Sequence, residues 1–268
     1  MVNVPGSGVR RPGIGKATKE LLEAQGHTVV GVDLKNADVI ADLSTRQGRI
    51  DGAFASVSAA DGSVDAVTAC GGVTAPTPLT VSVNYFGMAE FLDAMAPVLA
   101  KAEAPPVVLI SSYSSLQEND SSLVDAMCVE DDEDKAREIA QKIADEQGPQ
   151  VAQGLIYAST KRAISRWVRR ESTKEQWAGA GIPLNAVGPG VIRIPMTEEW
   201  LKWEEGRQYL AIVVRMPPNG FAEPEVVAEL MIWLTSPANT HVTGQTIYVD
   251  GGADVAMRGD DIWGPLDK

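Results

Sequence analysis

Short, β-branched apolar runs alternate along this chain with amphipathic segments of about 10 to 15 residues. Residues 16–25 predict a helix with an apolar stripe, and Gly26 suits its end. Residues 28–32 then predict a buried strand that finishes before Asp33. Further strands are expected at 64–69, 107–110, 183–187 and 246–249, and further helices at 85–99, 158–170 and 224–234. This order predicts an α/β fold, a doubly wound parallel sheet with helices on both faces.

We expect one domain over residues 1–268, because no Pro/Gly-rich linker and no internal repeat divides the chain. A hydrophobic content of 44% with 22% charged residues is typical of a globular protein. No apolar run is long enough to span a bilayer and no signal peptide is evident, so a cytoplasmic protein is expected. Two cysteines and two isolated histidines, His27 and His241, predict neither a disulfide framework nor a metal site.

The formal net charge of −13 argues against nucleic acid and anionic membranes as partners, because both are polyanions. Residues 117–147 contain 11 acidic and 3 basic residues, which gives this segment −8 of the total. We interpret it as an acidic insertion. It predicts a helix over 134–147, with Ile139 and Ile143 on one face and a Glu138/Lys142 pair on another.

Several polar or glycine-rich stretches follow directly after predicted strands, at the sheet edge where ligands bind in such folds. They are a glycine-rich first loop, Asp33, residues 70–72 and residues 111–112. The first loop ends in Gly13-Ile14-Gly15, a pattern that lets backbone amides approach a pyrophosphate. Asp33 lies 18 residues after Gly15, where a carboxylate accepts hydrogen bonds from ribose hydroxyls and repels a 2′-phosphate. NAD(H) is therefore predicted over NADP(H), although Lys35 lies close by.

Two other enzyme classes are disfavoured by particular residues. A phosphate-binding P-loop would need glycine at position 10 and Ser or Thr at position 17, where the chain has Arg10 and Ala17. A serine hydrolase is disfavoured because no G-x-S-x-G motif occurs and neither histidine has a suitable setting.

Tyr157 and Lys161 lie four residues apart, which places them on one face of a helix. An ammonium group favours the phenolate of a nearby tyrosine and is expected to lower its pKa toward the range useful in acid–base catalysis. The pair therefore predicts a proton-transfer site.

Together these residues resemble the short-chain dehydrogenases/reductases over nearly the whole chain, and among them most closely the bacterial 3α-hydroxysteroid dehydrogenases/carbonyl reductases. The motifs that carry the family resemblance are Gly13-Ile14-Gly15, Cys70-Gly71-Gly72, Val83-Asn84-Tyr85-Phe86-Gly87, Ile110-Ser111-Ser112, Tyr157-Ala158-Ser159-Thr160-Lys161, Asn185-Ala186-Val187-Gly188-Pro189-Gly190 and Val249-Asp250-Gly251-Gly252. The closer resemblance rests on residues 21–27, 39–45 and 81–87. The resemblance implies a Rossmann fold and an NAD(H)-dependent oxidoreductase that interconverts a secondary alcohol and a ketone, with a hydroxysteroid or another bulky cyclic carbonyl compound as substrate. A non-catalytic NAD-binding regulator on the same fold is the alternative.

The resemblance also implies a role for each matching residue. Tyr157 is the general acid/base, Lys161 lowers its pKa and binds the nicotinamide ribose, and Ser112 hydrogen-bonds the substrate oxygen. Asn84 holds a water that connects Lys161 to solvent. The implied catalytic set is Asn84, Ser112, Tyr157 and Lys161. The implied cofactor contacts are Gly8, Gly13, Ile14 and Gly15 in the first loop, Asp33, Asp42 and Leu43 around the adenosine, Gly71 and Gly72 near its ribose, Tyr157 and Lys161, and Pro189, Gly190 and Ile192 beside the nicotinamide.

Three departures from the family pattern bear on these expectations. The first loop has one residue more than usual if Gly8 is its first glycine, and Pro5 interrupts the expected first strand. Ile194 stands where the family usually has a threonine that contacts the nicotinamide carboxamide. Ser112 and Tyr157 are separated by 44 residues, where about a dozen are usual.

The long acidic segment is expected to lie over the substrate mouth or over the helices through which relatives pair. A homodimer built through another surface is therefore predicted, with the usual tetramer as the alternative.

Overall fold

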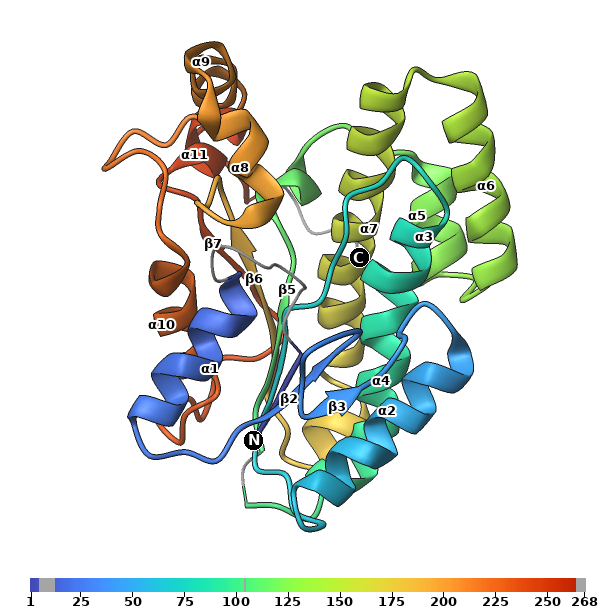
Figure 1. The fold of residues 1–268 in the computed structure, drawn as a ribbon, viewed down its shortest axis with the longest axis vertical. Helices are drawn as coiled ribbons and strands as arrows, with labels where there is room; N and C mark the ends of the chain where they lie inside the picture. Colours follow the sequence, from blue (N-terminus) through green and yellow to red (C-terminus); the bar gives the residue numbers. More distant parts are fainter. Residues whose placement is uncertain (5–12, 104, 264–268) are drawn as a thin grey trace.

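A computed structural model describes residues 1–4, 13–103 and 105–263. Seven parallel strands form one sheet in the order β3-β2-β1-β4-β5-β6-β7 (Figure 1). The strands are β1 Val2–Val4, β2 Val30–Asp33, β3 Val39–Ile40, β4 Val67–Ala69, β5 Val107–Ile110, β6 Leu184–Pro189 and β7 Thr246–Val249. The predicted doubly wound α/β sheet is confirmed. β1 corresponds to the expected first strand, and β3 was not predicted.

The central strands are apolar because both of their faces are covered. Every residue of β4, β5 and β6 is buried, as expected for a parallel sheet between two helical layers. β1 ends at Val4, directly before Pro5, and pairs with both β2 and β4. The strand order therefore reverses at β1, and a ligand crevice is expected between the carboxyl ends of β1 and β4.

Helices cover both faces of this sheet (Figure 1). α1 (Ile14–Ala24) packs against α10 (Pro224–Leu234) on one face. α2 (Arg46–Ala59), α4 (Gly87–Leu99) and α7 (Pro149–Glu171) lie on the other. α7 begins nine residues before the expected start at 158, and it carries Tyr157 and Lys161 inside the helix.

The helix expected over 85–99 is preceded by two further turns. A short helix α3 (Leu79–Val81) runs into a π-helical turn η1 (Ser82–Phe86), and α4 follows. Asn84 therefore lies in a π-helical turn, a local geometry that often marks functional positions.

The acidic insertion folds into two helices, α5 (Ser121–Cys128) and α6 (Glu133–Glu146). The predicted helix over 134–147 is confirmed by α6, although Lys142 lies 3.9 Å from Glu146 and does not pair with Glu138. α5 and α6 pack against α7, and α6 also contacts α3 and η1. The insertion thus lies on the outer side of α7 (Figure 1).

Near the carboxyl end of β6, two helices, α8 (Pro195–Lys202) and α9 (Glu204–Val213), stand above the sheet (Figure 1). We call them the α8–α9 lid. The remaining elements are the short helices η2 (Tyr113–Leu116), η3 (Glu175–Gly179) and α11 (Ala253–Arg258). Among the residues that the structure describes, no helix is long and apolar enough to cross a bilayer.

Candidate active site

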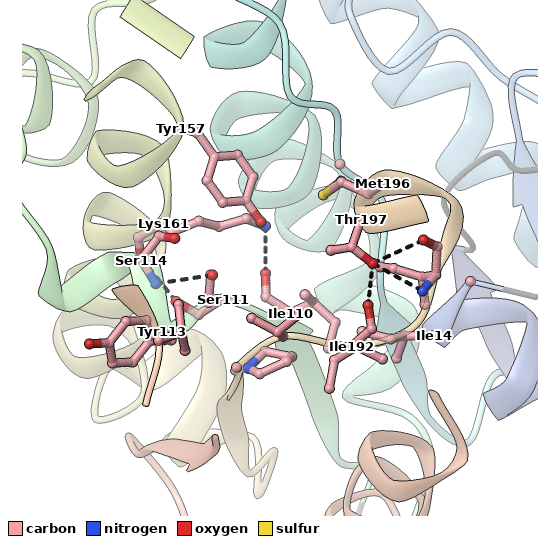
Figure 2. A pocket seen from close by; sticks show the side chains of 18 of the residues that line it. Ile14, Ile110, Ser111, Tyr113, Ser114, Tyr157, Lys161, Ile192, Met196 and Thr197 are labelled. Atoms are coloured by element: carbon pink, nitrogen blue, oxygen red, sulfur yellow. Dashed lines mark hydrogen bonds between the residues drawn. The ribbon is translucent and has the colours of Figure 1, made fainter. Parts of the chain in front are cut away.

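A cavity of about 290 Å³ opens at the carboxyl edge of the sheet (Figure 2). Its walls come from the start of α1, the ends of β4, β5 and β6, the middle of α7, and the α8–α9 lid. Of the predicted site residues, the cavity is lined by Gly13, Ile14, Gly15, Gly72, Ser112, Tyr157, Lys161, Pro189, Gly190 and Ile192. The topology therefore brings together groups that lie up to 179 residues apart in the sequence.

Lys161 is 2% exposed, and its ammonium Nζ donates a hydrogen bond to the Ile110 carbonyl at 2.9 Å (Figure 2). Burial lowers the pKa of this lysine to about 8, because the charged form loses its hydration. Its Nζ lies 5.6 Å from the centre of the Tyr157 ring. Lys161 is thus positioned beside the tyrosine, as the helical spacing predicted.

The expected direction of the Tyr157 pKa shift is wrong for this structure. Burial raises the pKa of the Tyr157 phenol, and a hydrogen bond with Ser112 only partly opposes the rise. The Lys161 Nζ is directed to the Ile110 carbonyl. In this structure the neutral phenol is therefore favoured, which is the form that can donate a proton.

The two serines after β5 have different environments. Ser111 is fully buried, and its hydroxyl interacts with the Lys161 carbonyl at 3.1 Å and with the Ser165 hydroxyl at 2.8 Å. Ser112 begins the turn η2, where its Oγ accepts a hydrogen bond from the Ser114 amide at 3.1 Å. Of the two, Ser112 is the one that interacts with Tyr157.

Asn84 lies behind the cavity and does not line it. Its amide accepts from the Val73 N–H at 2.8 Å and donates to the Val73 carbonyl at 2.9 Å. These bonds hold the loop that carries Gly72. A Cβ at Gly72 would lie 3.4 Å from Asn84 Oδ1 and 3.6 Å from Lys161 Nζ. Glycine at this position therefore leaves the space beside the lysine open.

Three further cofactor-binding predictions, Asp33, Asp42 and Leu43, lie outside the cavity, on the β2–β3 side of the sheet. Asp33 ends β2, and burial raises the pKa of its carboxyl while backbone amides, Leu34 first, oppose the shift. Asp42 is exposed and Leu43 is buried, just beyond β3. Gly71 is buried next to Gly72. Gly8 lies outside the described residues.

Thr197 is a cavity residue that the sequence argument did not name individually. Ile194 occupies the position where a threonine was expected, but the Thr197 hydroxyl lies one helical turn further on, in the first turn of α8. It donates to the carbonyls of Ile192 and Ile194 and accepts from the Ile194 amide (Figure 2). The sequence signal for Thr197 was its hydroxyl, three residues after Ile194, the position where the family usually has a threonine.

The lid end of the cavity is apolar. Tyr113, Val191 and Val214 are buried in a cluster completed by partly buried residues of the α8–α9 lid, among them Leu210 and Val213. The family resemblance implies that the substrate pocket comes mostly from loops, here residues 74–78, 113–117 and 193–218. Residues from the second and third of these loops line the cavity. No residue of loop 74–78 lines it, and Thr74 is hydrogen-bonded by Gln153 on α7.

Comparisons with known proteins identify the fold family. A 3-alpha-hydroxysteroid dehydrogenase/carbonyl reductase of Comamonas testosteroni is 38% identical over 251 residues, which cover 92% of this chain and 94% of the relative. The chain belongs to the short-chain dehydrogenase/reductase family. The family model described as enoyl-(acyl carrier protein) reductase matches residues 135–254.

Two further comparisons agree with this family. The crystal structure of a 3-alpha-hydroxysteroid dehydrogenase from Pseudomonas sp. B-0831, complexed with NADH, superposes with a TM-score of 0.82 at 34% identity and covers 97% of this chain and 100% of that one. A 3-oxoacyl-(acyl-carrier-protein) reductase of Thermotoga maritima is 25% identical over 90% of this chain and 93% of its own. The chain is thus a short-chain dehydrogenase/reductase that acts on CH–OH groups and is similar to hydroxysteroid dehydrogenases.

Proposed function

We propose that this short-chain dehydrogenase/reductase is NAD(H)-dependent and interconverts a bulky, apolar secondary alcohol, such as a hydroxysteroid, with its ketone. One observation carries the proposal: Ser112, Tyr157 and Lys161 meet at the middle of a cavity with a glycine-lined end and an apolar end. The glycine-lined end suits a dinucleotide, and the apolar end suits a substrate without charge.

The residues present fit a nicotinamide cofactor. α1 begins after Gly13 with no side-chain cap and no acidic residue in its first turn, so its N-terminal amides are available to a pyrophosphate. Asp33 lies at the carboxyl end of the neighbouring strand, at the distance along the chain expected for a residue that binds the adenosine ribose. Its ionised carboxyl would repel a 2′-phosphate, which supports NAD(H) over NADP(H).

The chain's own groups supply the proton chemistry. When bound, the cofactor supplies or accepts the hydride. The neutral Tyr157 phenol donates its proton to the ketone oxygen, and Ser112 hydrogen-bonds the same oxygen as negative charge develops on it. Lys161 holds a positive charge near this position at neutral pH, because its pKa of about 8 leaves it mostly protonated. In alcohol oxidation the proton moves in the opposite direction.

The apolar end favours a substrate of some size. Leu210 and Val213 from α9, Met196 from α8 and Val191 after β6 line the cavity opposite the proton-transfer groups. Rigid, apolar rings gain free energy from burial against such a surface, roughly 25 cal/mol for each Å². A hydroxysteroid meets this requirement better than a small polar ketone.

The test is to follow NADH oxidation with a panel of ketones that includes 3-oxosteroids and small cyclic ketones. Faster turnover of the steroids with NADH than with NADPH supports the proposal. Tight NADH binding with no turnover of any ketone, and no oxidation of any alcohol, would favour the non-catalytic regulator. A clear preference for NADPH would contradict the cofactor part of the proposal.

A further inference from the structure

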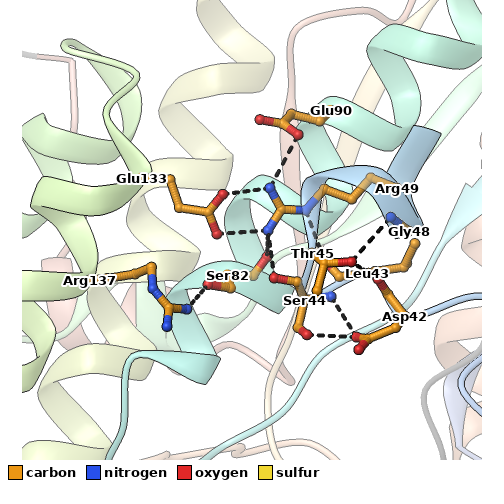
Figure 3. Close-up of polar contacts among 10 residues, drawn as sticks. All are labelled: Asp42, Leu43, Ser44, Thr45, Gly48, Arg49, Ser82, Glu90, Glu133 and Arg137. Carbon is orange, nitrogen blue, oxygen red and sulfur yellow. Dashed lines mark hydrogen bonds and ion pairs between the residues drawn. The ribbon is translucent and has the colours of Figure 1, made fainter.

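Arg49 is the largest charged side chain in the interior, with 0% of its surface exposed. It lies on the inner face of α2, and its guanidinium bonds groups from four separate segments (Figure 3). Nε donates to the Leu43 carbonyl at 2.9 Å, and Nη2 donates to the carbonyls of Ser44 at 3.2 Å and Ser82 at 3.1 Å. Nη1 donates to two carboxylates, Glu133 and Glu90, and Nη2 donates to Glu133 as well.

Glu133 is the closer of the two carboxylates. Its two oxygens accept from Nη1 at 2.6 Å and from Nη2 at 2.7 Å, a bidentate arrangement, whereas Glu90 lies at 3.2 Å. Glu133 is the first residue of α6, so the acidic insertion supplies the principal counter-charge of this buried arginine. A buried cation without such a partner would be costly, which makes Glu133 a requirement for the position of Arg49.

Two of the three carbonyls that Arg49 binds, those of Leu43 and Ser44, belong to the segment that follows β3. This segment contains Asp42 and Leu43, which the resemblance assigns to the adenine end of the cofactor. Its fit against α2 is close, because a Cβ at Gly48 would lie only 2.1 Å from the Asp42 carbonyl oxygen. Asp42 itself stays exposed, with one carboxylate oxygen bonded to the amide and hydroxyl of Ser44.

We propose that Arg49, oriented by Glu133 of the insertion, is a positioning residue that holds the segment of Asp42, Leu43 and Ser44 in place for the adenine of the cofactor. The acidic insertion thereby contributes to cofactor affinity although it lies outside the cavity. This inference rests on the proposed use of NAD(H).

The catalytic side chains are held by hydrogen bonds that do not involve Arg49, so a change at Arg49 is expected to affect cofactor binding selectively. Arg49 also bonds the Ser82 carbonyl in the turn that carries Asn84, but the Asn84 side chain is fixed independently by Val73. Lys161 is fixed by the Ile110 carbonyl. Disturbing Arg49 is therefore expected to weaken adenine binding and to leave the chemical step unchanged.

The experiment compares Glu133→Gln with Glu138→Gln. Glu138 lies on the same helix, α6, and is exposed, so its change removes the same charge without reaching Arg49. For Glu133→Gln we expect at least a fivefold rise in the dissociation constant of NADH, with kcat at saturating NADH unchanged. Reduced nicotinamide mononucleotide, which lacks the adenosine half, should give the same kcat/KM with the variant and the wild type. Glu138→Gln should match the wild type with both cofactors.

Glu133→Asp keeps the charge and should bind NADH more tightly than Glu133→Gln. This recovery would show that the loss in Glu133→Gln comes from the missing charge and not from a general loss of structure. An unchanged NADH affinity in Glu133→Gln would overturn the inference, and so would an equal loss with the mononucleotide. If the wild-type protein binds no NADH at all, the proposed function fails instead. That outcome is recognised before any variant is made.

Discussion

Tyr157 and Lys161 share one helical turn, and burial acts on them in opposite directions. It raises the pKa of the tyrosine and lowers that of the lysine to about 8, so each shift favours the neutral form. The sequence predicted their proximity from the spacing on α7. It could not predict these shifts, because they depend on how deeply α7 is covered and on the Ile110 carbonyl that binds Lys161.

Tyr157→Phe tests the general acid directly. Removing the hydroxyl should lower turnover by at least about 100-fold, the scale of a lost general acid. The ring is retained, so NADH affinity should stay nearly unchanged. Steady-state kinetics and fluorescence titration of NADH measure the two quantities, and wild-type turnover would remove Tyr157 from the mechanism.

The pKa of Lys161 predicts a pH dependence of cofactor binding. The ammonium is charged below about pH 8 and loses its proton above it, so affinity for an anionic dinucleotide should fall as the pH rises. We expect the dissociation constant of NADH to increase about tenfold between about pH 7 and about pH 9. Lys161→Ala should bind NADH more weakly, turn over more slowly and lose this dependence. A pH-independent wild-type affinity would contradict the prediction.

Asp33→Ala is expected to relax the choice of cofactor toward NADP(H), because the carboxylate no longer repels the 2′-phosphate. The ratio of kcat/KM values for NADPH and NADH should rise by about tenfold or more, corresponding to roughly 1.4 kcal/mol. A wild-type protein that already prefers NADPH would show the interpretation of Asp33 to be wrong, and Lys35 would then be the first residue to test.

At the scale of elements, the helices that the sequence revealed are those with apolar inner faces. The apolar stripe of α1 is evident in the sequence, whereas α2 was not predicted. The buried positions of α2 follow helical spacing, but they are Arg49, Gly52, Ala53 and Ser56, which carry little hydrophobic signal. β3 was missed for a related reason: it has only two residues, and Ile40 is exposed.

The α8–α9 lid was predicted only as a loop, and its contribution to substrate choice can be measured. Leu210→Ala removes part of the apolar wall and should lower kcat/KM for a steroid-sized ketone by about 10-fold, the value of roughly 1.4 kcal/mol of lost apolar contact. A small cyclic ketone, which cannot reach the wall, should be little affected. Ile212→Ala on the same helix is the control, since Ile212 is 71% exposed and does not line the cavity. Equal losses for both ketones would argue against a substrate role for the lid.

At the scale of the whole molecule, the insertion was recognised from its charge. The sequence left open whether it lies over the substrate mouth or over the helices through which relatives pair. It lies along α7 and η1, and among the described residues none from 118 to 148 lines the cavity. The sequence alone could not predict where the insertion lies, because contacts that hold it in place, such as Glu133 with Arg49, join residues 84 positions apart.

The position of the insertion supports a proposal about assembly. α5 packs on α7, which carries Tyr157 and is one of the helices through which relatives are expected to pair, and the acidic residues that follow α5, at 130–132, are exposed. A second copy would meet like charge there. We therefore expect a homodimer formed through another surface. Light scattering should give about twice the chain mass of 28.5 kDa, and a mass near four times that value would contradict the prediction.

The insertion also has a consequence for the kinetics of folding. It places 44 residues between Ser112 and Tyr157, which must meet for the site to exist. Compared with a connection of about a dozen residues, the added loop-closure entropy is only about 1 kcal/mol. Burial of Leu123, Met127 and Ile143 within the insertion offsets it. Because α5 and α6 are built from local contacts, they can form early and shorten the effective gap before the two residues meet. Substitutions in this small core should therefore delay the appearance of activity during refolding more than they lower the final rate.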